Sequence, residues 1–223
     1  KCIFVPIGNA GNITAIMAGF LKLYELEIIT DLPRVFGVQS AHADPVYRYY
    51  SIEDPNEREY QPVKVQPSVA QAAMIGNPVS FPRVKHFAEK FEAIGGKKAF
   101  QVVQVSEQMI MDSMLLANSH GHIACTQGGE CFAGLIRAKE LGLISENESA
   151  VLDSTAHQLK FIGFQDMYYQ NDFPAEYEVT PDSTRANKPE LVIEGSEKEK
   201  MSEADYISKA AENVVSMLGL EKK

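Results

Sequence analysis

Three short polar clusters with the residue types of a ligand-binding site each follow an apolar run of the sequence. They read GNAGN at residues 8–12, CTQGGE at residues 125–130 and DSTAH at residues 153–157. If the apolar runs are strands of an open α/β sheet, the clusters lie at strand carboxyl ends, where ligands bind in such sheets. The sequence therefore predicts one site built from segments that are far apart in the chain.

The first cluster has the make-up of a phosphate-binding turn, because a strand-like run leads into it and a helix-like run follows at once. A helix N-terminus presents unpaired N–H groups and the positive end of its dipole. Gly8 and Gly11 have no side chain to block a close approach, and Asn9 and Asn12 add neutral donors. The pattern favours phosphate, although a tight strand–helix turn without a ligand fits the same residues. It is neither a Walker A loop nor GxGxxG.

Alternating strands and helices are expected to position these clusters. Apolar runs predict strands at 1–7, 33–39, 99–105, 122–126 and 149–155. Helical spacing and capping residues predict helices at 13–29, 43–50, 68–76, 77–96, 106–121, 128–144 and about 202–220. Residues 51–66 are expected to be a loop, and residues 162–200 a loop-rich wrap. The alternation predicts an α/β fold with a doubly wound, mostly parallel sheet flanked by helices.

Charge and composition argue against several classes of protein. The 223 residues carry a net charge of −9, which argues against the basic face that nucleic-acid binding needs. No apolar run reaches the roughly 18 residues that span a bilayer. Three cysteines, at positions 2, 125 and 131, do not make a disulfide framework, so a reducing, cytoplasmic location is expected.

Four segments resemble motifs of the threonine synthases. VPIGNAGNITAIMAGF is similar to their phosphate loop, V-P-T-G-N-F-G-N, and LPRVFGVQS to the strand that follows it. SVAQAAMIGNPVSF resembles the segment of that family that ends I-G-N-P, and STAHQLKF its late S/T-x-H-x-x-K-F turn. The order and spacing of the four agree over residues 3–161. The family depends on pyridoxal 5'-phosphate (PLP), has the tryptophan-synthase-β-like fold and converts O-phosphohomoserine and water to threonine and phosphate.

The resemblance implies a role for each matching residue, and a place in threonine biosynthesis. Residues of the first cluster would cradle the cofactor phosphate: Gly8, Asn9, Ala10, Gly11 and Asn12. The hydroxyl of Thr155 would hydrogen-bond the pyridine nitrogen, although a threonine that caps a turn fits that position equally. Asn77 and His157 are weaker candidates for contact with substrate, since a helix cap and a turn histidine explain them as well. No metal site is expected.

The lysine that carries PLP as a Schiff base in this family is not found. It belongs to an S-F-K-D-like motif upstream of the phosphate loop, as does the segment that holds the substrate carboxylate. The chain is therefore expected to be the C-terminal portion of an enzyme, inactive alone, whose N-terminal half is a missing partner. Residues 1–161 would form part of a PLP-binding domain and residues 162–223 a loop-rich extension that ends in a helix. A homo-oligomer is possible.

One cluster departs from the threonine synthase pattern and keeps other functions open. The family often has F-V-E-P-x-S-A-A where this chain has IACTQGGE. A different PLP-dependent enzyme of the same fold group, such as a dehydratase or a cysteine synthase, is one alternative. A non-catalytic phosphate-binding module is another. A metal site at His120, His122 and Cys125 lacks a fourth ligand, and a turn entering a strand is the favoured interpretation.

Overall fold

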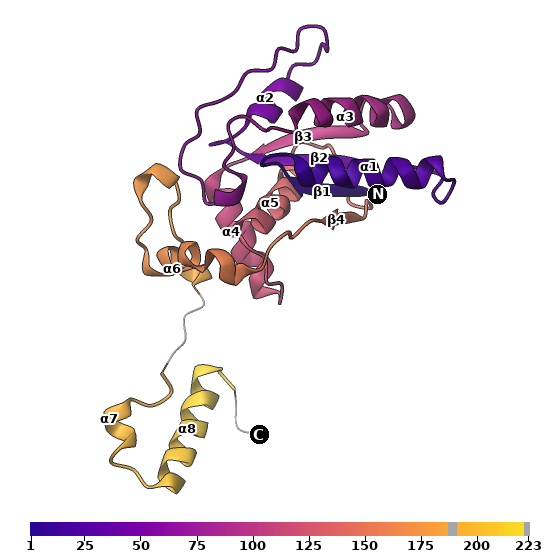
Figure 1. Ribbon diagram of the computed structural model, residues 1–223. Coiled ribbons are helices and arrows are strands. Elements are labelled where there is room, and N and C mark those ends of the chain that lie inside the picture. Colours follow the sequence, from indigo (N-terminus) through magenta and orange to yellow (C-terminus); the bar gives the residue numbers. More distant parts are fainter. Residues whose placement is uncertain (187–190, 221–223) are drawn as a thin grey trace. The chain divides into compact units, whose positions relative to one another are not determined.

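The computed structural model describes residues 1–186 and 191–220, which belong to two compact units (Figure 1). The first unit is Lys1–Ala186 and the second is Asn187–Lys223. Among the described residues, no helix combines the length and the apolar character needed to cross a membrane.

The first unit alternates strands with helices, as the sequence predicts. Its strands are β1 (Cys2–Pro6), β2 (Arg34–Ser40), β3 (Phe100–Val105) and β4 (Ala150–Leu152). Its α-helices are α1 (Gly11–Glu25), α2 (Pro45–Tyr50), α3 (Phe81–Gly95), α4 (Glu107–Ser119), α5 (Thr126–Glu140) and α6 (Ile162–Gln170). Its 3-10 turns are η1 (Gln71–Ala73), η2 (Gln158–Phe161), η3 (Ala175–Tyr177) and η4 (Ser183–Arg185).

The four strands form one parallel sheet in the order β3-β2-β1-β4. Ile3 lies opposite Val35, and Val35 lies opposite Phe100 on the next strand. On the other side of β1, Phe4 lies opposite Leu152 of β4. Parallel neighbours need a long crossover between them, and the helices provide it. The predicted α/β class with a parallel sheet is confirmed.

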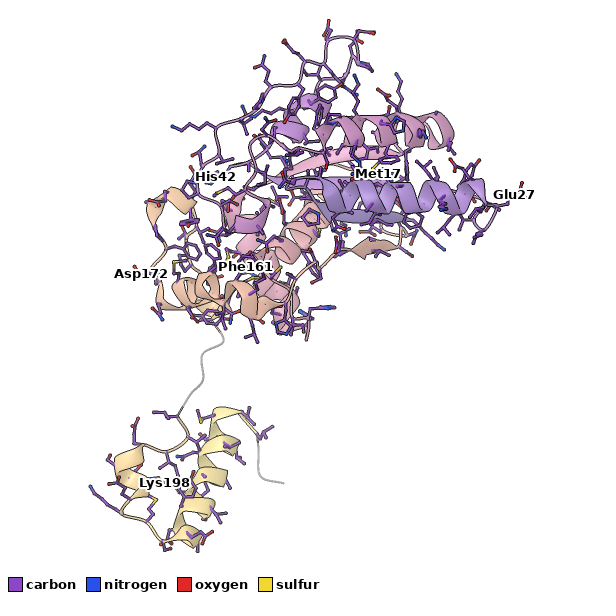
Figure 2. The ribbon with its side chains drawn as sticks, in the orientation of Figure 1. Met17, Glu27, His42, Phe161, Asp172 and Lys198 are labelled. Carbon is purple, nitrogen blue, oxygen red and sulfur yellow. The ribbon has the colours of Figure 1, made fainter. Side chains whose placement is uncertain are left out.

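Helices cover both faces of this sheet (Figure 1). On one face, Ile3 and Val5 pack with α1 and α3, and the buried Met17 of α1 belongs to this core (Figure 2). On the other face, the stacked rings of Phe4 and Phe36 pack with α4 and α5, and their centroids are 4.6 Å apart. Successive residues of β1 thus enter opposite cores, as strand geometry requires. This is the doubly wound arrangement that the sequence predicts.

The direction in which strands are added reverses between β1 and β4. The chain first builds outward from β1 to β3, with α1 and α3 on one face. It then crosses the other face through α4 and α5 and returns to the far side of β1. The crevice at the carboxyl ends of strands beside such a switch point is the usual ligand site of open α/β sheets. Residues 8–12 and 153–157 both follow strands at this point.

The prediction of a strand at residues 122–126 is wrong, because this segment forms no strand of the sheet. Ile123 is 59% exposed, and α5 already begins at Thr126. Ala124 makes one isolated antiparallel bridge with His157. Its N–H donates to the side-chain oxygen of Asn118 at 2.8 Å, and its carbonyl accepts from the Asn118 amide at 3.2 Å. An asparagine side chain thus bonds the backbone groups that a neighbouring strand would have bonded.

The helix predicted at residues 68–76 is reduced to the single turn η1. The Val69 N–H and the Ser68 hydroxyl donate to the buried carboxylate of Glu107 instead of joining a helix. The helix predicted at residues 77–96 begins later, at Phe81, and a helix that the sequence did not predict, α6, lies within residues 162–200.

Residues 162–186 belong to the first unit, and Phe164 and Tyr168 of α6 are buried in the same core as residues of α4 and α5. The predicted PLP-binding domain, residues 1–161, lies within that unit and stays a prediction. The second unit contains α7 (Gly195–Lys198) and α8 (Glu203–Met217). Ser202 caps α8 by accepting the Asp205 N–H at 3.2 Å, and α8 agrees with the predicted final helix.

Candidate functional site

The turn between β1 and α1 leaves the start of the helix without a side-chain cap. Ala10 is the N-cap residue, and its φ of 63° lies in the left-handed region. The first helical hydrogen bond runs from the Thr14 N–H to the Ala10 carbonyl at 3.3 Å. The N–H groups of Gly11, Asn12 and Ile13 precede that bond, so they are the free donors of a helix start.

Ala10 is an unusual choice for this position. Alanine is among the poorest N-cap residues, because it has no oxygen to accept from the first turn. The left-handed conformation also costs a non-glycine residue about 1–2 kcal/mol. By contrast, Ser106 caps α4 by accepting the Met109 N–H at 3.2 Å. Local strain combined with free donors is the arrangement expected of an anion site.

The two glycines of the turn serve different purposes. A Cβ atom on Gly8 would lie 3.1 Å from the Ala73 Cα atom and 3.2 Å from the Ala72 carbonyl oxygen, so Gly8 permits close packing against η1. A Cβ atom on Gly11 would meet no heavy atom within 4 Å. Packing of the protein therefore does not require a glycine at Gly11, whereas the close approach of a ligand would.

A cavity of about 240 Å³ lies in front of this turn. Its lining comes from four segments: the β1–α1 turn, η1, the start of α5 and the turn after β4. The ten lining residues are Pro6, Gly8, Asn9, Ala10, Gly11, Asn12, Ala72, Ala73, Gln127 and Thr155. The structure thus brings together all six residues that the sequence assigned to the cofactor, and their contact with a cofactor stays a prediction.

Thr155 is held in a strained conformation at the edge of the cavity. Its φ is 46°, and a β-branched residue in the left-handed region is a true outlier. Its N–H donates to the Asp153 Oδ1 atom at 3.0 Å. The other carboxylate oxygen of Asp153 accepts from the side-chain amide of Asn12, across the switch point. The turn after β4 is therefore bonded to the first turn of α1.

The two weaker candidates do not line the cavity. The Asn77 side-chain oxygen accepts from the Tyr60 hydroxyl at 3.0 Å. His157 caps η2, because its Nδ1 atom accepts from the Leu159 N–H at 3.1 Å. For His157 this is the turn position that the sequence left open, whereas Asn77 is not the helix cap that was its alternative, because Ser80 is the N-cap of α3.

Gln127 lines the cavity, but the sequence did not single it out. It is 4% exposed, and with its amide oxygen turned toward η1 it accepts from the N–H groups of Gln71 at 3.2 Å and Ala72 at 3.0 Å. Its presence in the polar cluster at residues 125–130 was the available signal. Ala72 and Ala73 gave none, since small apolar residues in a loop carry no recognisable chemistry.

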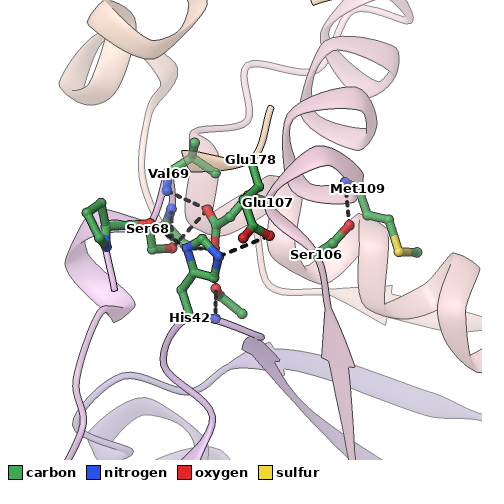
Figure 3. A network of polar contacts seen from close by, with 10 residues as sticks. His42, Ser68, Val69, Ser106, Glu107, Met109 and Glu178 are labelled. Atoms are coloured by element: carbon green, nitrogen blue, oxygen red, sulfur yellow. Dashed lines mark hydrogen bonds and ion pairs between the residues drawn. The ribbon is translucent and has the colours of Figure 1, made fainter. Parts of the chain in front are cut away.

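A buried carboxylate supports the η1 wall of the cavity (Figure 3). Glu107 accepts from the Val69 N–H at 2.6 Å and from the hydroxyls of Ser68, at 3.1 Å, and Ser40. Burial raises the pKa of the Glu107 carboxyl, and these hydrogen bonds act in the opposite direction. The loop that leads into η1 is thus fixed from the interior of the protein.

The three candidate metal ligands have other surroundings. The Cys125 sulfur is buried and caps α5 by accepting the Gly128 N–H at 3.4 Å. His120 Nδ1 lies 2.9 Å from the Leu116 carbonyl oxygen, and the His122 ring packs on Phe132. In the part of the chain that the structure describes, no group of three histidine, cysteine or acidic side chains could hold a metal ion.

The ten residues that line the cavity include no lysine and no acidic side chain. The site offers backbone N–H groups, neutral amides and one hydroxyl. Such donors can bind and orient a phosphorylated ring compound, but none of them forms a covalent bond to an aldehyde.

Comparison with known proteins agrees with this geometry. Residues 1–154 match the family model described as pyridoxal-phosphate dependent enzyme. Over 159 residues the chain is 34% identical to threonine synthase 2, chloroplastic, of Arabidopsis thaliana, covering 71% of this chain and 29% of the relative. Over 158 residues it is 31% identical to threonine synthase of Methanocaldococcus jannaschii, covering 71% and 37%. The chain thus spans about a third of the length of these curated relatives.

Solved structures share the fold. The Escherichia coli threonine synthase matches with a TM-score of 0.54 at 18% identity, over 85% of this chain and 39% of that one. The processed form of threonine deaminase isoform 2 from Solanum lycopersicum matches with a TM-score of 0.51 at 15% identity, over 73% and 42%. The predicted fold group and the resemblance to threonine synthases are confirmed, and members of the matched family use PLP. The chain belongs to the family of pyridoxal-phosphate-dependent enzymes.

Proposed function

We propose that the chain binds PLP at the switch point and forms part of a threonine synthase, a lyase that converts O-phosphohomoserine and water to threonine and phosphate. One observation carries most of the proposal: the uncapped start of α1 and Gly11 open onto a cavity that Thr155 also lines. The curated relatives named threonine synthase support the choice of reaction within the family.

The cavity residues fit the two ends of PLP. The N–H groups of Gly11, Asn12 and Ile13 would donate to the phosphate, and the α1 dipole favours its negative charge. Thr155 would hydrogen-bond the pyridine nitrogen. Bound PLP supplies an electron sink for elimination and replacement at amino-acid carbons.

The other role of these residues is to orient the bound ring within the cavity. A neutral hydroxyl at Thr155 orients the ring without holding the ring nitrogen protonated, as a carboxylate would. Gln127 and η1 form one side of the cavity and are joined by hydrogen bonds from the Gln71 and Ala72 N–H groups to the Gln127 side chain. Each contribution is one of binding and orientation, and none is a covalent step.

The covalent step is assigned to a lysine outside these residues. The resemblance to threonine synthases implies that this lysine and the substrate-carboxylate segment belong to an N-terminal half that precedes the phosphate loop. The isolated chain would then bind PLP without turning over substrate. Val151, on the edge strand β4, is 63% exposed, which fits association with further polypeptide, either that half or a second copy. A cytoplasmic location, finally, fits the three free cysteines.

The direct test is release of phosphate from O-phosphohomoserine in the presence of PLP. We expect none from the 223-residue chain alone, and threonine and phosphate in equal amounts from a longer polypeptide that contains it. Deamination of threonine or serine, or sulfide-dependent formation of cysteine, by the longer polypeptide would replace this reaction with another of the same family. Turnover by the chain alone would refute the division of roles.

The assignment of Thr155 has its own test in the longer polypeptide. Thr155→Asp places a carboxylate at the proposed ring nitrogen, and aspartate accepts the left-handed backbone better than threonine does. We expect turnover to fall at least tenfold while PLP affinity changes less. The conservative Thr155→Ser should retain most of the turnover, and unchanged turnover in Thr155→Asp would contradict the assignment.

A further inference from the structure

One carboxylate connects the two walls of the cavity without lining it. Asp153 directly follows β4, and its N–H donates to the Phe4 carbonyl of β1 at 3.0 Å, so the sheet fixes its backbone. Its Oδ1 atom accepts the Thr155 N–H at 3.0 Å, and its Oδ2 atom accepts from the Asn12 side-chain amide. These partners are separated by more than half of the chain.

Both partners of this carboxylate lie on the cavity surface, and both belong to conformations that need support. Asn12 is in the first turn of α1, next to the free N–H groups, and that turn has no side-chain cap. Thr155 has a φ of 46°, which a β-branched residue adopts only where its surroundings hold it. The Asp153 carboxylate supplies one hydrogen bond to each.

We propose that Asp153 is a positioning residue that sets the distance between the phosphate end and the ring end of the site through Asn12 and Thr155. The proposal rests on the proposed function for the nature of the ligand. Asp153 itself would not touch the ligand. Its removal would leave each wall folded and lose their mutual placement, which a molecule bound at both ends requires.

The experiment compares variants of the 223-residue chain by their dissociation constants for PLP and their thermal unfolding midpoints. Asp153→Ala removes both hydrogen bonds, and Asn12→Ala removes one. Asp153→Asn can keep both, because its oxygen still accepts the Thr155 N–H while its amide donates to the oxygen of a flipped Asn12. Asp54→Ala is the matched control: Asp54 also accepts an N–H two residues on and an asparagine amide, both from Asn56, in an exposed loop.

The expected results distinguish coupling of the two cavity walls through Asp153 from a local effect of each substitution. Asp153→Ala should weaken PLP binding about tenfold, and the double variant with Asn12→Ala should be no weaker than the worse single variant. Asp153→Asn should stay within about threefold of the unmodified chain, and Asp54→Ala should bind as the unmodified chain does. Equal PLP affinity in Asp153→Ala, or additive losses in the double variant, would overturn the proposal.

A second readout needs no ligand and separates this proposal from the proposed function. Hydrogen exchange of the Thr155 amide should speed up at least tenfold in Asp153→Ala, more modestly in Asn12→Ala, and hardly at all in Asp153→Asn. If the unmodified chain does not bind PLP, the proposed function fails while this exchange pattern still tests the coupling. An Asn12→Ala variant with unchanged Thr155 exchange would show that the two walls are independent.

Discussion

Gly11 has a side-chain position that the protein leaves open. A Cβ atom there meets no heavy atom within 4 Å, and the residue lines the cavity at the start of α1. A Cβ atom can therefore be added at Gly11 without a clash, and because Gly11 lines the cavity, we expect a larger side chain to reduce the space in front of the free N–H groups. This separates ligand binding from stability at a single residue.

Gly11→Val should weaken PLP binding at least tenfold and leave the unfolding midpoint nearly unchanged. Gly19→Val is the matched control, since Gly19 lies on the same helix, is exposed, and a Cβ atom there would also meet no heavy atom within 4 Å. Titration calorimetry and a thermal melt of both variants check this. Equal PLP affinity in the two variants would remove the phosphate site from the start of α1.

Ala10 has a conformation that costs stability. Its φ of 63° suits glycine, so Ala10→Gly should stabilise the chain by about 1 kcal/mol. Ala15→Gly, at an exposed position in the interior of α1, should destabilise it by a similar amount. Urea unfolding of both variants measures the difference. The same sign for the two substitutions would show that Ala10 is not strained.

At the scale of elements, the helix α5 buries an ionisable side chain, the carboxyl of Glu130, in the interior of the protein. Glu130 is fully buried, and among the described residues its carboxyl oxygens make no hydrogen bond of good geometry, although the Ser40 backbone lies near enough to lower its pKa somewhat. Burial, and then the neighbouring charge of Glu107, raise the pKa of Glu130 well above its ordinary value of 4.5. The folded state therefore holds this carboxyl in its neutral form more strongly than the unfolded state does.

The sign of the pH dependence follows from that shift. With a pKa raised by folding, the stabilising contribution of the proton is complete below pH 4.5 and is lost as the pH rises toward the folded-state pKa. Glu130→Gln removes this titration at nearly constant volume. The variant should gain about 1–3 kcal/mol over the unmodified chain at pH 8 and much less at pH 4.5. Glu53→Gln, at an exposed loop position, is the control. A gain that does not depend on pH would contradict the buried neutral carboxyl.

How far the sequence predicts these elements depends on where their stability originates. β1 and β2 are largely buried apolar runs, β3 is a partly buried one, Ser106 is a recognisable cap for α4, and α8 has an amphipathic pattern, so these elements follow from local sequence. The segment before α5 resembles a strand because it is short and apolar, yet the Asn118 side chain bonds Ala124 instead.

Other elements depend on partners that are distant in the sequence. The Ser68 hydroxyl and the Val69 N–H donate to Glu107, which lies far along the chain. The helix α6 depends on burial of Phe164 and Tyr168 rather than on its own pattern. In the site, the glycine-rich turn and Thr155 were recognisable from composition and resemblance, whereas Gln127 and Asp153 act through contacts that only the folded chain brings together.

At the scale of the whole molecule, the doubly wound order explains why the site lies where it does. Reversal of strand order between β1 and β4 brings residues 8–12 beside residues 153–155, and α5 starts at the same place. The resulting cavity presents donors for a phosphate and a hydroxyl for a ring. Since the chain spans about a third of its curated relatives, catalysis by this cavity is proposed only for a larger assembly.

The central claim is that the free N–H groups of α1 bind the phosphate of PLP. Calorimetric titration of the 223-residue chain with PLP, and separately with pyridoxal, tests it most directly, because the two ligands share the pyridine ring and only PLP carries the phosphate. PLP should bind at least tenfold more tightly than pyridoxal, and inorganic phosphate should compete with it. Equal affinities for PLP and pyridoxal, or no competition by phosphate, would contradict it.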